Sequence, residues 1–179
     1  IRSYSQHRPS YRLKIISFEI DLRLLEFALQ NALELEYIQG FEDACRALLE
    51  KKIWQSPNQQ IDWHLLAGDF RETISGAPGP ADIIFFDPYS PKMNTEMWST
   101  ETFSKLKKSS HAATINQATR FTELLTYTQA TPVRFKLLKA GFFVGVGDAT
   151  GLKKETTVAS TSLRSLKLPL DARWCQRLL

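Results

Sequence analysis

Apolar and polar positions along the chain follow two different periods, one typical of strands and one typical of helices. Short runs rich in β-branched and aromatic residues predict strands at 13–19, 61–67 and 81–86. Between these runs, apolar residues recur every three or four positions, as they do on one face of an amphipathic helix. The helices predicted in this way cover residues from about 21 to 32, 37 to 52, 70 to 74 and 95 to 107.

The second half of the chain continues the alternation of strands and helices. Residues 121–127 predict a strand. Thr131 and Pro132 predict the start of a helix, with the threonine as N-cap and the proline at the first position. Gly141 predicts the end of that helix, at the position where a left-handed residue commonly follows. Two further strands are predicted to form a closing antiparallel pair, at 142–146 and 156–160.

This order of elements, without internal repeats, predicts an α/β fold with a mainly parallel sheet and helices on both faces. The strand at 81–86 is continuously apolar, so we expect both of its faces to be buried. Ligands of such sheets bind at the carboxyl ends of the strands. The predicted organisation is a tail or linker at 1–12, a domain at 13–162 and a C-terminal tail at 163–179.

Composition narrows the class of protein only slightly. A chain of 179 residues with 43% hydrophobic content can bury the core of one domain. The formal net charge of +4 is compatible with a polyanionic partner. We expect no metal site, because Cys45 and Cys175 are isolated and the three histidines are scattered. We also expect a cytoplasmic protein, since no apolar run is long enough to span a membrane and no signal peptide is recognisable.

An acidic residue stands at the end of each of the first three predicted strands: Glu19, Asp69 and Asp87. A carboxylate accepts two hydrogen bonds side by side, so Glu19 can bind both hydroxyls of a ribose. Asp69 can accept from the exocyclic amine of an adenine, while Phe70 covers the adenine ring and its backbone N–H meets a ring nitrogen. The alternative for each acid is a helix N-cap or a solvated strand end.

A proline-rich loop directly follows the third strand. Pro88 and Pro91 restrict its backbone, and a rigid loop at a strand end can hold a nucleophile in line with a reacting carbon. Tyr89 and Trp98 can stack on a base, and Lys92 can contact a phosphate. The alternative is a proline-rich turn with the tryptophan in the core, because buried tryptophan is common.

The sequence of residues 87–98, Asp-Pro-Tyr-Ser-Pro-Lys-Met-Asn-Thr-Glu-Met-Trp, resembles the D-x-F-x-P-x-K-N-P-x-M-W signature of the MnmC-like methyltransferase domain. It departs at Pro88 and Tyr89, where well-known members have Gly and Phe, and at Thr95, which replaces a proline. The similarity covers about residues 13–160 and includes Phe18-Glu19 and Gly68-Asp69 upstream. Downstream it includes Tyr127-Thr128, Ala130-Thr131, Val133-Arg134, Ala140-Gly141-Phe142 and 151–155.

The resemblance implies a class I, Rossmann-like methyltransferase that uses S-adenosyl-L-methionine. Its implied reaction is N-methylation of the 5-aminomethyl group of a modified wobble uridine, so tRNA is the implied partner. Members of the family can be fused to an FAD-dependent oxidase domain. The implied catalytic residue is Asp87, and the implied cofactor-binding residues are Glu19, Gly68, Asp69, Phe70, Asp87 and Pro88. The implied substrate-binding residues are Tyr89, Pro91, Lys92, Trp98, Arg134, Lys153 and Lys154.

The family's fold opens with a strand and a glycine-rich loop that holds the methionine end of the cofactor. No G-x-G-x-G sequence stands before Leu13, so we expect the N-terminus of the domain to be missing. In the family that strand neighbours the strands expected here at 13–19 and 81–86. Its absence would leave two strand edges with unpaired backbone groups, and we therefore expect reduced stability or activity of the isolated chain.

Two alternatives to this function stay open. The first is a class I methyltransferase that acts on another nucleic-acid amine, because Asp87-Pro88 resembles the start of the [DN]-P-P-[YF] motif. The second is an inactive α/β module that binds nucleotide or RNA. Arg134 and the pair Lys153-Lys154 can contact phosphate, but a solvated face is an equal interpretation.

Overall fold

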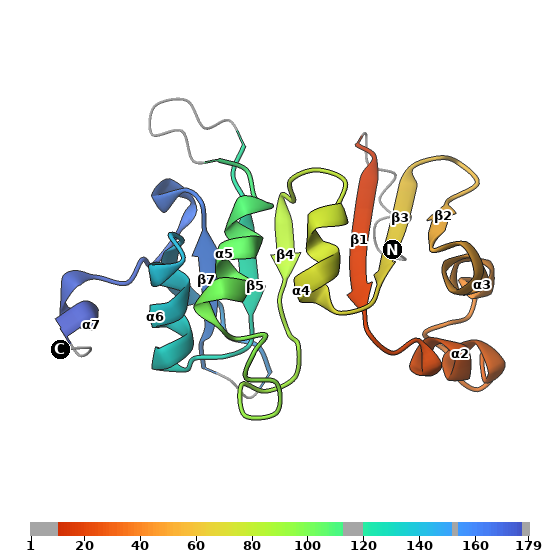
Figure 1. The fold of residues 1–179 in the computed structure, drawn as a ribbon, viewed down its shortest axis with the longest axis horizontal. Helices are drawn as coiled ribbons and strands as arrows, with labels where there is room; N and C mark the ends of the chain where they lie inside the picture. The colour runs from red at the N-terminus through yellow and green to blue at the C-terminus, as the bar shows by residue number, and fades with distance from the viewer. Residues whose placement is uncertain (1–10, 113–119, 152–153, 177–179) are drawn as a thin grey trace. The chain divides into compact units, whose positions relative to one another are not determined.

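The computed structural model describes residues 11–112, 120–151 and 154–176. The chain divides into two compact units, 1–77 and 78–179, and each contains a β-sheet of its own (Figure 1). The fold is mixed α/β, as the alternation of strands and helices predicted. Lys153 and most of the predicted tail at 1–12 lie outside the described residues.

The sheet of the first unit has three strands in the order β1-β3-β2. Strand β1 (Leu13–Glu19) is parallel to β3 (Ile61–Ala67), with Leu13 opposite Ile61 and Glu19 opposite Ala67. The short strand β2 (Ile53–Gln55) is antiparallel to β3 and was not predicted. Because β1 and β3 are parallel, their carboxyl ends lie at the same edge of the sheet.

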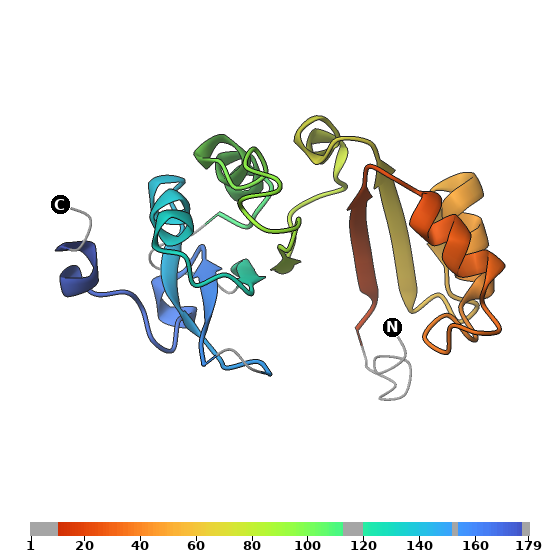
Figure 2. The ribbon, with the colours of Figure 1, turned by 90° about the horizontal axis from the view of Figure 1, so that it is seen from below.

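Helices α2 (Arg23–Gln30) and α3 (Glu42–Lys51) pack together in the first unit (Figure 2). Helix α3 begins later than predicted, because the chain passes through Gly40 at a φ of +82°, which a continuous right-handed helix excludes. The predicted apolar faces of both helices are confirmed. They bury Ala28, Ile38 and Cys45, with Leu25, Leu29, Ala32 and Leu35 partly buried against them.

The sheet of the second unit has four strands in the order β4-β5-β7-β6. Strands β4 (Ile83–Phe85) and β5 (Glu123–Thr126) are parallel. Strand β7 (Thr156–Ser160) is antiparallel to both β5 and β6 (Phe143–Gly147). The closing antiparallel pair is confirmed, but the prediction of a mainly parallel sheet is wrong for the described residues. Only β1–β3 and β4–β5 are parallel there.

Helices α5 (Thr100–Lys108) and α6 (Thr131–Lys139) pack against each other in the second unit. Helix α5 begins at its Ser99 cap rather than near residue 95. Ala130, whose side chain makes no capping hydrogen bond, occupies the N-cap position of helix α6, so Thr131 is its first residue and Pro132 its second, each one position later than predicted. Gly141 follows the end of the helix at a φ of +88°, as predicted. Short helical segments complete the fold: α4 (Phe70–Thr73), η1 (Ile74–Gly76), η2 (Leu163–Ser165) and α7 (Ala172–Gln176). The core of this unit buries Phe103, Leu106, Leu124, Val133, Leu137, Val144 and Ala159.

Strand β4 is not buried on both faces, which corrects the prediction made from its apolar sequence. Ile83 is 57% exposed and Phe85 is 81% exposed. Ile83 and Phe85 are two positions apart and therefore share one face of the strand, which is largely uncovered, whereas Phe86 on the other face is buried. Strand β4 also lies at the end of its sheet and pairs only with β5 among the described residues. In the described part of the chain, no helix has both the length and the apolar character needed to cross a membrane.

Candidate functional site

The carboxyl edge of the β1–β3 pair brings the predicted cofactor residues of the first unit together. The backbone N–H of Gly68 donates to the carbonyl of Glu19 over 2.9 Å. The Glu19 carboxylate is exposed, and its Oε1 accepts from the backbone N–H of Asp21 over 3.0 Å. Asp21 in turn accepts from the backbone and side chain of Arg23. The side-chain hydrogen bond from Arg23 is the largest cause that lowers the pKa of Asp21 to about 2.

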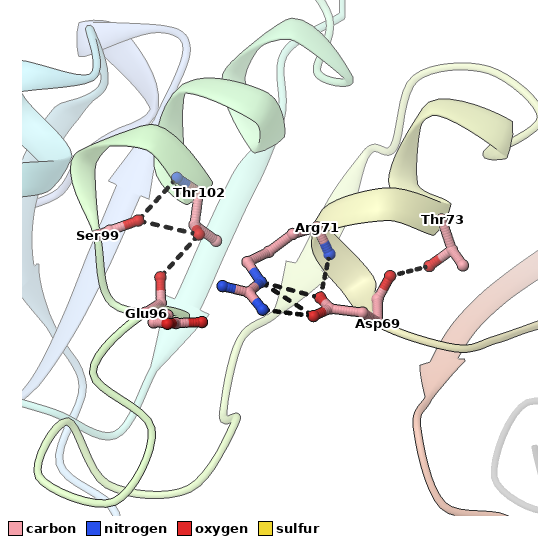
Figure 3. Close-up of polar contacts among 6 residues, drawn as sticks. All are labelled: Asp69, Arg71, Thr73, Glu96, Ser99 and Thr102. Carbon is pink, nitrogen blue, oxygen red and sulfur yellow. Dashed lines mark hydrogen bonds and ion pairs between the residues drawn. The ribbon is translucent and has the colours of Figure 1, made fainter.

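Gly68 turns the chain from β3 into helix α4. Its φ is +126°, and a Cβ placed there would lie 3.2 Å from Cγ2 of Thr73, so the turn requires glycine. Asp69 then caps α4, because its carboxylate accepts from the backbone N–H of Arg71 over 2.8 Å. The hydroxyl of Thr73 donates to the carbonyl of Asp69 over 2.9 Å (Figure 3).

The side chain of Arg71 closes on the same carboxylate. Its Nε lies 3.0 and 3.1 Å from the two oxygens of Asp69, and its Nη2 lies 2.5 Å from Oδ2 (Figure 3). This hydrogen bond is the largest cause that raises the pKa of Arg71. Asp69 therefore has the N-cap role that the sequence left as an alternative, and an adenine amine would have to share its carboxylate with Arg71. Arg71 was not predicted as a site residue, although a basic residue two positions after a strand-end acid is a signal that the sequence carries.

Phe70 lies against the end of β1. Its ring meets the ring of Phe18 edge to face, with centroids 4.7 Å apart and planes at 73°. The first unit thus gathers the four predicted residues Glu19, Gly68, Asp69 and Phe70 at one edge of its sheet. An exposed carboxylate and a partly buried aromatic ring at a strand end are groups suited to a ribose and a base.

In the second unit, the loop of residues 87–98 begins where β4 ends. The N–H of Phe86 still pairs with the carbonyl of Leu125 over 2.9 Å, and Asp87 is the first exposed residue beyond it. The N–H of Tyr89 donates back to the carbonyl of Asp87 over 3.0 Å, across Pro88. Tyr89 has a φ of +58°, which is rare for a bulky residue, and its side chain is 74% exposed.

Trp98 is the last residue of the loop and is only 2% exposed. Its indole Nε1 donates to the carbonyl of Tyr89 over 3.2 Å. Its ring packs edge to face on Phe86, with centroids 5.2 Å apart, and also meets Phe103 at 6.4 Å. A ring buried in this way offers no face to a nucleic-acid base. The predicted stacking role of Trp98 is therefore corrected, because the residue belongs to the core.

The far end of the loop is fixed to the start of helix α5. The buried Thr102 donates its hydroxyl to the carbonyl of Glu96 over 2.9 Å (Figure 3). Ser99 caps the helix by accepting from the N–H of Thr102 over 3.1 Å. Pro91 is partly buried within the loop, while Lys92 is exposed. The loop therefore presents Asp87, Tyr89 and Lys92 from a backbone that is anchored at both ends.

Arg134 does not lie on the surface, which corrects the prediction that it contacts phosphate. Its side chain is 6% exposed, and its Nε donates to the hydroxyl of Thr157 over 2.9 Å. Its Nη2 donates to Oε1 of Glu155 over 3.1 Å and to the carbonyl of Thr156 over 3.0 Å. Arg134 thus connects α6 to β7. Of the paired lysines, Lys154 is exposed, and Lys153 lies outside the described residues.

The described residues hold no cluster of three or more His, Cys, Asp and Glu side chains that could bind a metal ion. The candidate site residues form two groups. One is the strand-end group Glu19, Gly68, Asp69 and Phe70, and the other is the loop of residues 87–98 with its exposed carboxylate.

Comparison with known proteins adds three similarities. The profile of the family described as S-adenosyl-L-methionine-dependent methyltransferase matches residues 36–162. A relative from Leptospira interrogans, named tRNA 5-methylaminomethyl-2-thiouridine biosynthesis bifunctional protein MnmC, is 26% identical over 98% of this chain and 27% of its own length. A relative of the same name from a Marinomonas species is 31% identical over 80% of this chain and 19% of its own length.

The fold has a counterpart of known structure. MnmC2 from Aquifex aeolicus superposes with a TM-score of 0.58 and 22% sequence identity, over 93% of this chain and 59% of that one. At this identity the likeness establishes the fold alone, which is that of the Rossmann-like methyltransferases. The chain spans between about a fifth and about a quarter of the length of these two curated relatives.

Proposed function

The chain belongs to the S-adenosyl-L-methionine-dependent methyltransferases, and we propose that it methylates the amine of a 5-aminomethyl group on a modified wobble uridine of tRNA. The names of the two MnmC relatives support a role in tRNA modification. The observation that carries the proposal is the loop of residues 87–98. It presents an exposed carboxylate and an exposed aromatic ring directly after a parallel strand.

The residues of the first unit fit the nucleoside part of the cofactor. Oε1 of Glu19 accepts one backbone hydrogen bond, and Oε2 accepts none from the described residues, which leaves capacity for ribose hydroxyls. Gly68 lets the chain turn, so that Asp69 and Phe70 stand beside the end of β1. We assign the adenine to Asp69 and Phe70, with Arg71 sharing the carboxylate. When bound, the cofactor supplies an electrophilic methyl group on a sulfonium.

Asp87 is the proposed catalytic residue. The amine of the substrate attacks with its lone pair, so it must be unprotonated, and holding it in line accounts for most of the catalysis. A carboxylate is a far weaker base than an alkylamine. Asp87 therefore orients and polarises the amine as a hydrogen-bond acceptor, while the proton leaves to water. Pro88 follows Asp87 and restricts the backbone from which the carboxylate projects. For this reason we keep Pro88 among the proposed site residues.

The remaining exposed residues of the second unit fit a nucleic-acid substrate. Tyr89 presents its ring for stacking on a base, because 74% of the side chain is exposed. Lys92 and Lys154 are exposed cations suited to phosphate. Pro91 restricts the backbone of the loop between Tyr89 and Lys92. Trp98 and Arg134 are left out of the substrate-binding set because both are buried.

The test replaces Asp87 by asparagine, which keeps the shape of the side chain and removes its charge. We expect methyl transfer to a tRNA that carries the 5-aminomethyl group to fall by about 10²-fold, the cost of misplacing a reacting group by about 1 Å. S-adenosyl-L-methionine binding, measured by calorimetry on the same variant, shows whether Asp87 also contacts the cofactor, as the resemblance implies. The matched control is Asp171→Asn, because Asp171 is exposed and asparagine can still accept the hydrogen bond that its Oδ1 receives from the N–H of Trp174. Full transfer by Asp87→Asn at neutral pH contradicts the assignment.

The same assay separates the two other functions that the sequence leaves open. Transfer to another nucleic-acid amine, but not to the 5-aminomethyl group, would keep the enzyme class and change the substrate. Binding of tRNA without any transfer would favour the inactive binding module.

A further inference from the structure

Tyr89 combines two features that rarely occur together. Its backbone lies in the left-handed region at a φ of +58°, which an aromatic residue adopts only when its surroundings hold it there. Its ring is nevertheless 74% exposed, so the packing of that ring does not impose the conformation. The cause must therefore lie in the backbone contacts of Tyr89.

Two hydrogen bonds hold the backbone of Tyr89, one on each side. Its N–H donates to the carbonyl of Asp87 over 3.0 Å, and its carbonyl accepts from the indole Nε1 of Trp98 over 3.2 Å. The second bond is the only one of the two that involves a side chain. It comes from nine positions further along the chain and fixes where the peptide after Tyr89 points.

The donor itself is rigid. Trp98 is 2% exposed, and its ring packs edge to face against Phe86 and, at longer range, against Phe103. Phe86 is the last residue before Asp87 and is hydrogen-bonded to β5, so this aromatic cluster is continuous with the sheet. A buried indole N–H needs an acceptor, and the carbonyl of Tyr89 provides it.

We infer that Trp98 is a positioning residue. Its indole N–H holds Tyr89 in the left-handed conformation, and this directs the tyrosine ring toward solvent, where the substrate base stacks. The inference rests on the proposed function only for the identity of what the ring contacts. The backbone effect is a property of the chain alone.

The first measurement is independent of activity. Trp98→Phe keeps an aromatic ring in the cluster and removes only the donor, and amide hydrogen exchange then reports the order of the loop. Loss of one net hydrogen bond should speed exchange at Met93 and Asn94, whose N–H groups bond to Ser90, by about 3- to 10-fold. The matched control is Trp63→Phe, which removes the 2.9 Å indole bond to Ser17 in the first unit and should leave the loop unchanged.

The wild-type protein supplies a second check. The indole proton of Trp98, assigned by its absence from the spectrum of Trp98→Phe or by a backbone-linked experiment, should exchange far more slowly than that of a free peptide. Exchange at the free-peptide rate overturns the inference, and so does unchanged loop exchange in Trp98→Phe.

The second measurement tests the route through the ring of Tyr89. Trp98→Phe should raise the KM for tRNA by about 3- to 10-fold, the effect of one hydrogen bond, and leave S-adenosyl-L-methionine binding unchanged. In a Tyr89→Ala background the same substitution should add nothing, because the ring that it directs is gone. Equal effects in both backgrounds overturn the positioning role and favour a general loss of packing. If the wild type transfers no methyl group to tRNA, the proposed function fails, while the exchange measurements still decide the role of Trp98.

Discussion

Replacing Arg134 by methionine separates the structural interpretation of this residue from the phosphate-binding one. Arg134 stands in the segment whose pattern resembles the family, and its charge made it a candidate contact for tRNA. The structure instead buries the guanidinium and uses it to connect α6 with β7. Methionine fills most of the volume of the arginine stem and removes the charge together with every donor.

The expected cost follows from the contacts that the guanidinium makes. Three hydrogen bonds are lost, to the Thr157 hydroxyl, the Thr156 carbonyl and the Glu155 carboxylate. Such bonds contribute about 0.5–1.5 kcal/mol each, and a carbonyl left without its partner can cost about 1–3 kcal/mol. The ion-pair part is small, since the Glu155 side chain is 38% exposed and screened by water. Removal of a buried charge offsets part of the loss, so we expect a net destabilisation of about 2–4 kcal/mol.

Urea denaturation at neutral pH measures this difference, and tRNA binding at several salt concentrations is measured beside it. The control is Arg164→Met, because Arg164 is exposed in the short η2 segment. Arg134→Met should lose stability, yet the folded fraction should bind tRNA with an unchanged salt dependence. The reasoning is refuted if Arg134→Met is as stable as Arg164→Met while the slope of log affinity against log salt falls by about one, as it does when one phosphate contact is lost.

Two further outcomes follow from single buried groups. Thr126→Val should leave the free energy of unfolding unchanged or raise it by up to about 1 kcal/mol, because the buried Oγ1 of Thr126 has no hydrogen-bond partner among the described residues. A loss of more than about 1 kcal/mol in urea denaturation would mean that the hydroxyl is paired. Burial, and secondarily the charge of Glu42, raises the pKa of Cys45, so less thiolate is present at a given pH. At pH 8 a thiol reagent should therefore modify the exposed Cys175 at least about tenfold faster than Cys45, and equal rates would argue against the burial of Cys45.

Elements with long, clear hydrophobic periods were predictable from the sequence. The seven-residue strands β1 and β3 were found with their correct ends, and the antiparallel pair near the C-terminus was found with β6 one residue later than predicted. Strand β2 was missed because three residues are too few to show a period. The late starts of α3 and α5 were missed because the turns that precede them, at Gly40 and at 95–98, carry polar and apolar residues in nearly helical spacing. A backbone angle decides such boundaries, and a spacing pattern does not contain it.

The burial of β4 could not be derived from its own sequence. A continuous apolar run predicts a strand covered on both faces, whereas Ile83 and Phe85 are largely exposed. Burial depends on what lies beside a strand, and β4 has a single neighbour among the described residues.

At the candidate site, the sequence located the acidic residues at the strand ends but did not determine what each carboxylate binds. The acids at the strand ends were found by position, because an apolar run that stops at a carboxylate indicates a strand end. What each carboxylate binds depends on its neighbours. The Asp69 carboxylate accepts from Arg71, whereas one oxygen of Glu19 accepts no hydrogen bond from the described residues. The partners of a carboxylate are set by the folded chain, and a sequence pattern does not contain them.

The signature at 87–98 contains two kinds of residue, and the structure gives a physical way to separate them. Tyr89 is 74% exposed and Trp98 is 2% exposed, although both are aromatic and both were candidates for stacking. The buried one donates to the backbone of the exposed one. A motif can thus require a tryptophan because an exposed residue nine positions earlier needs a fixed backbone, without the tryptophan touching any ligand. This interpretation makes Trp98→Phe and Tyr89→Ala non-additive, which two independent ligand contacts would not be.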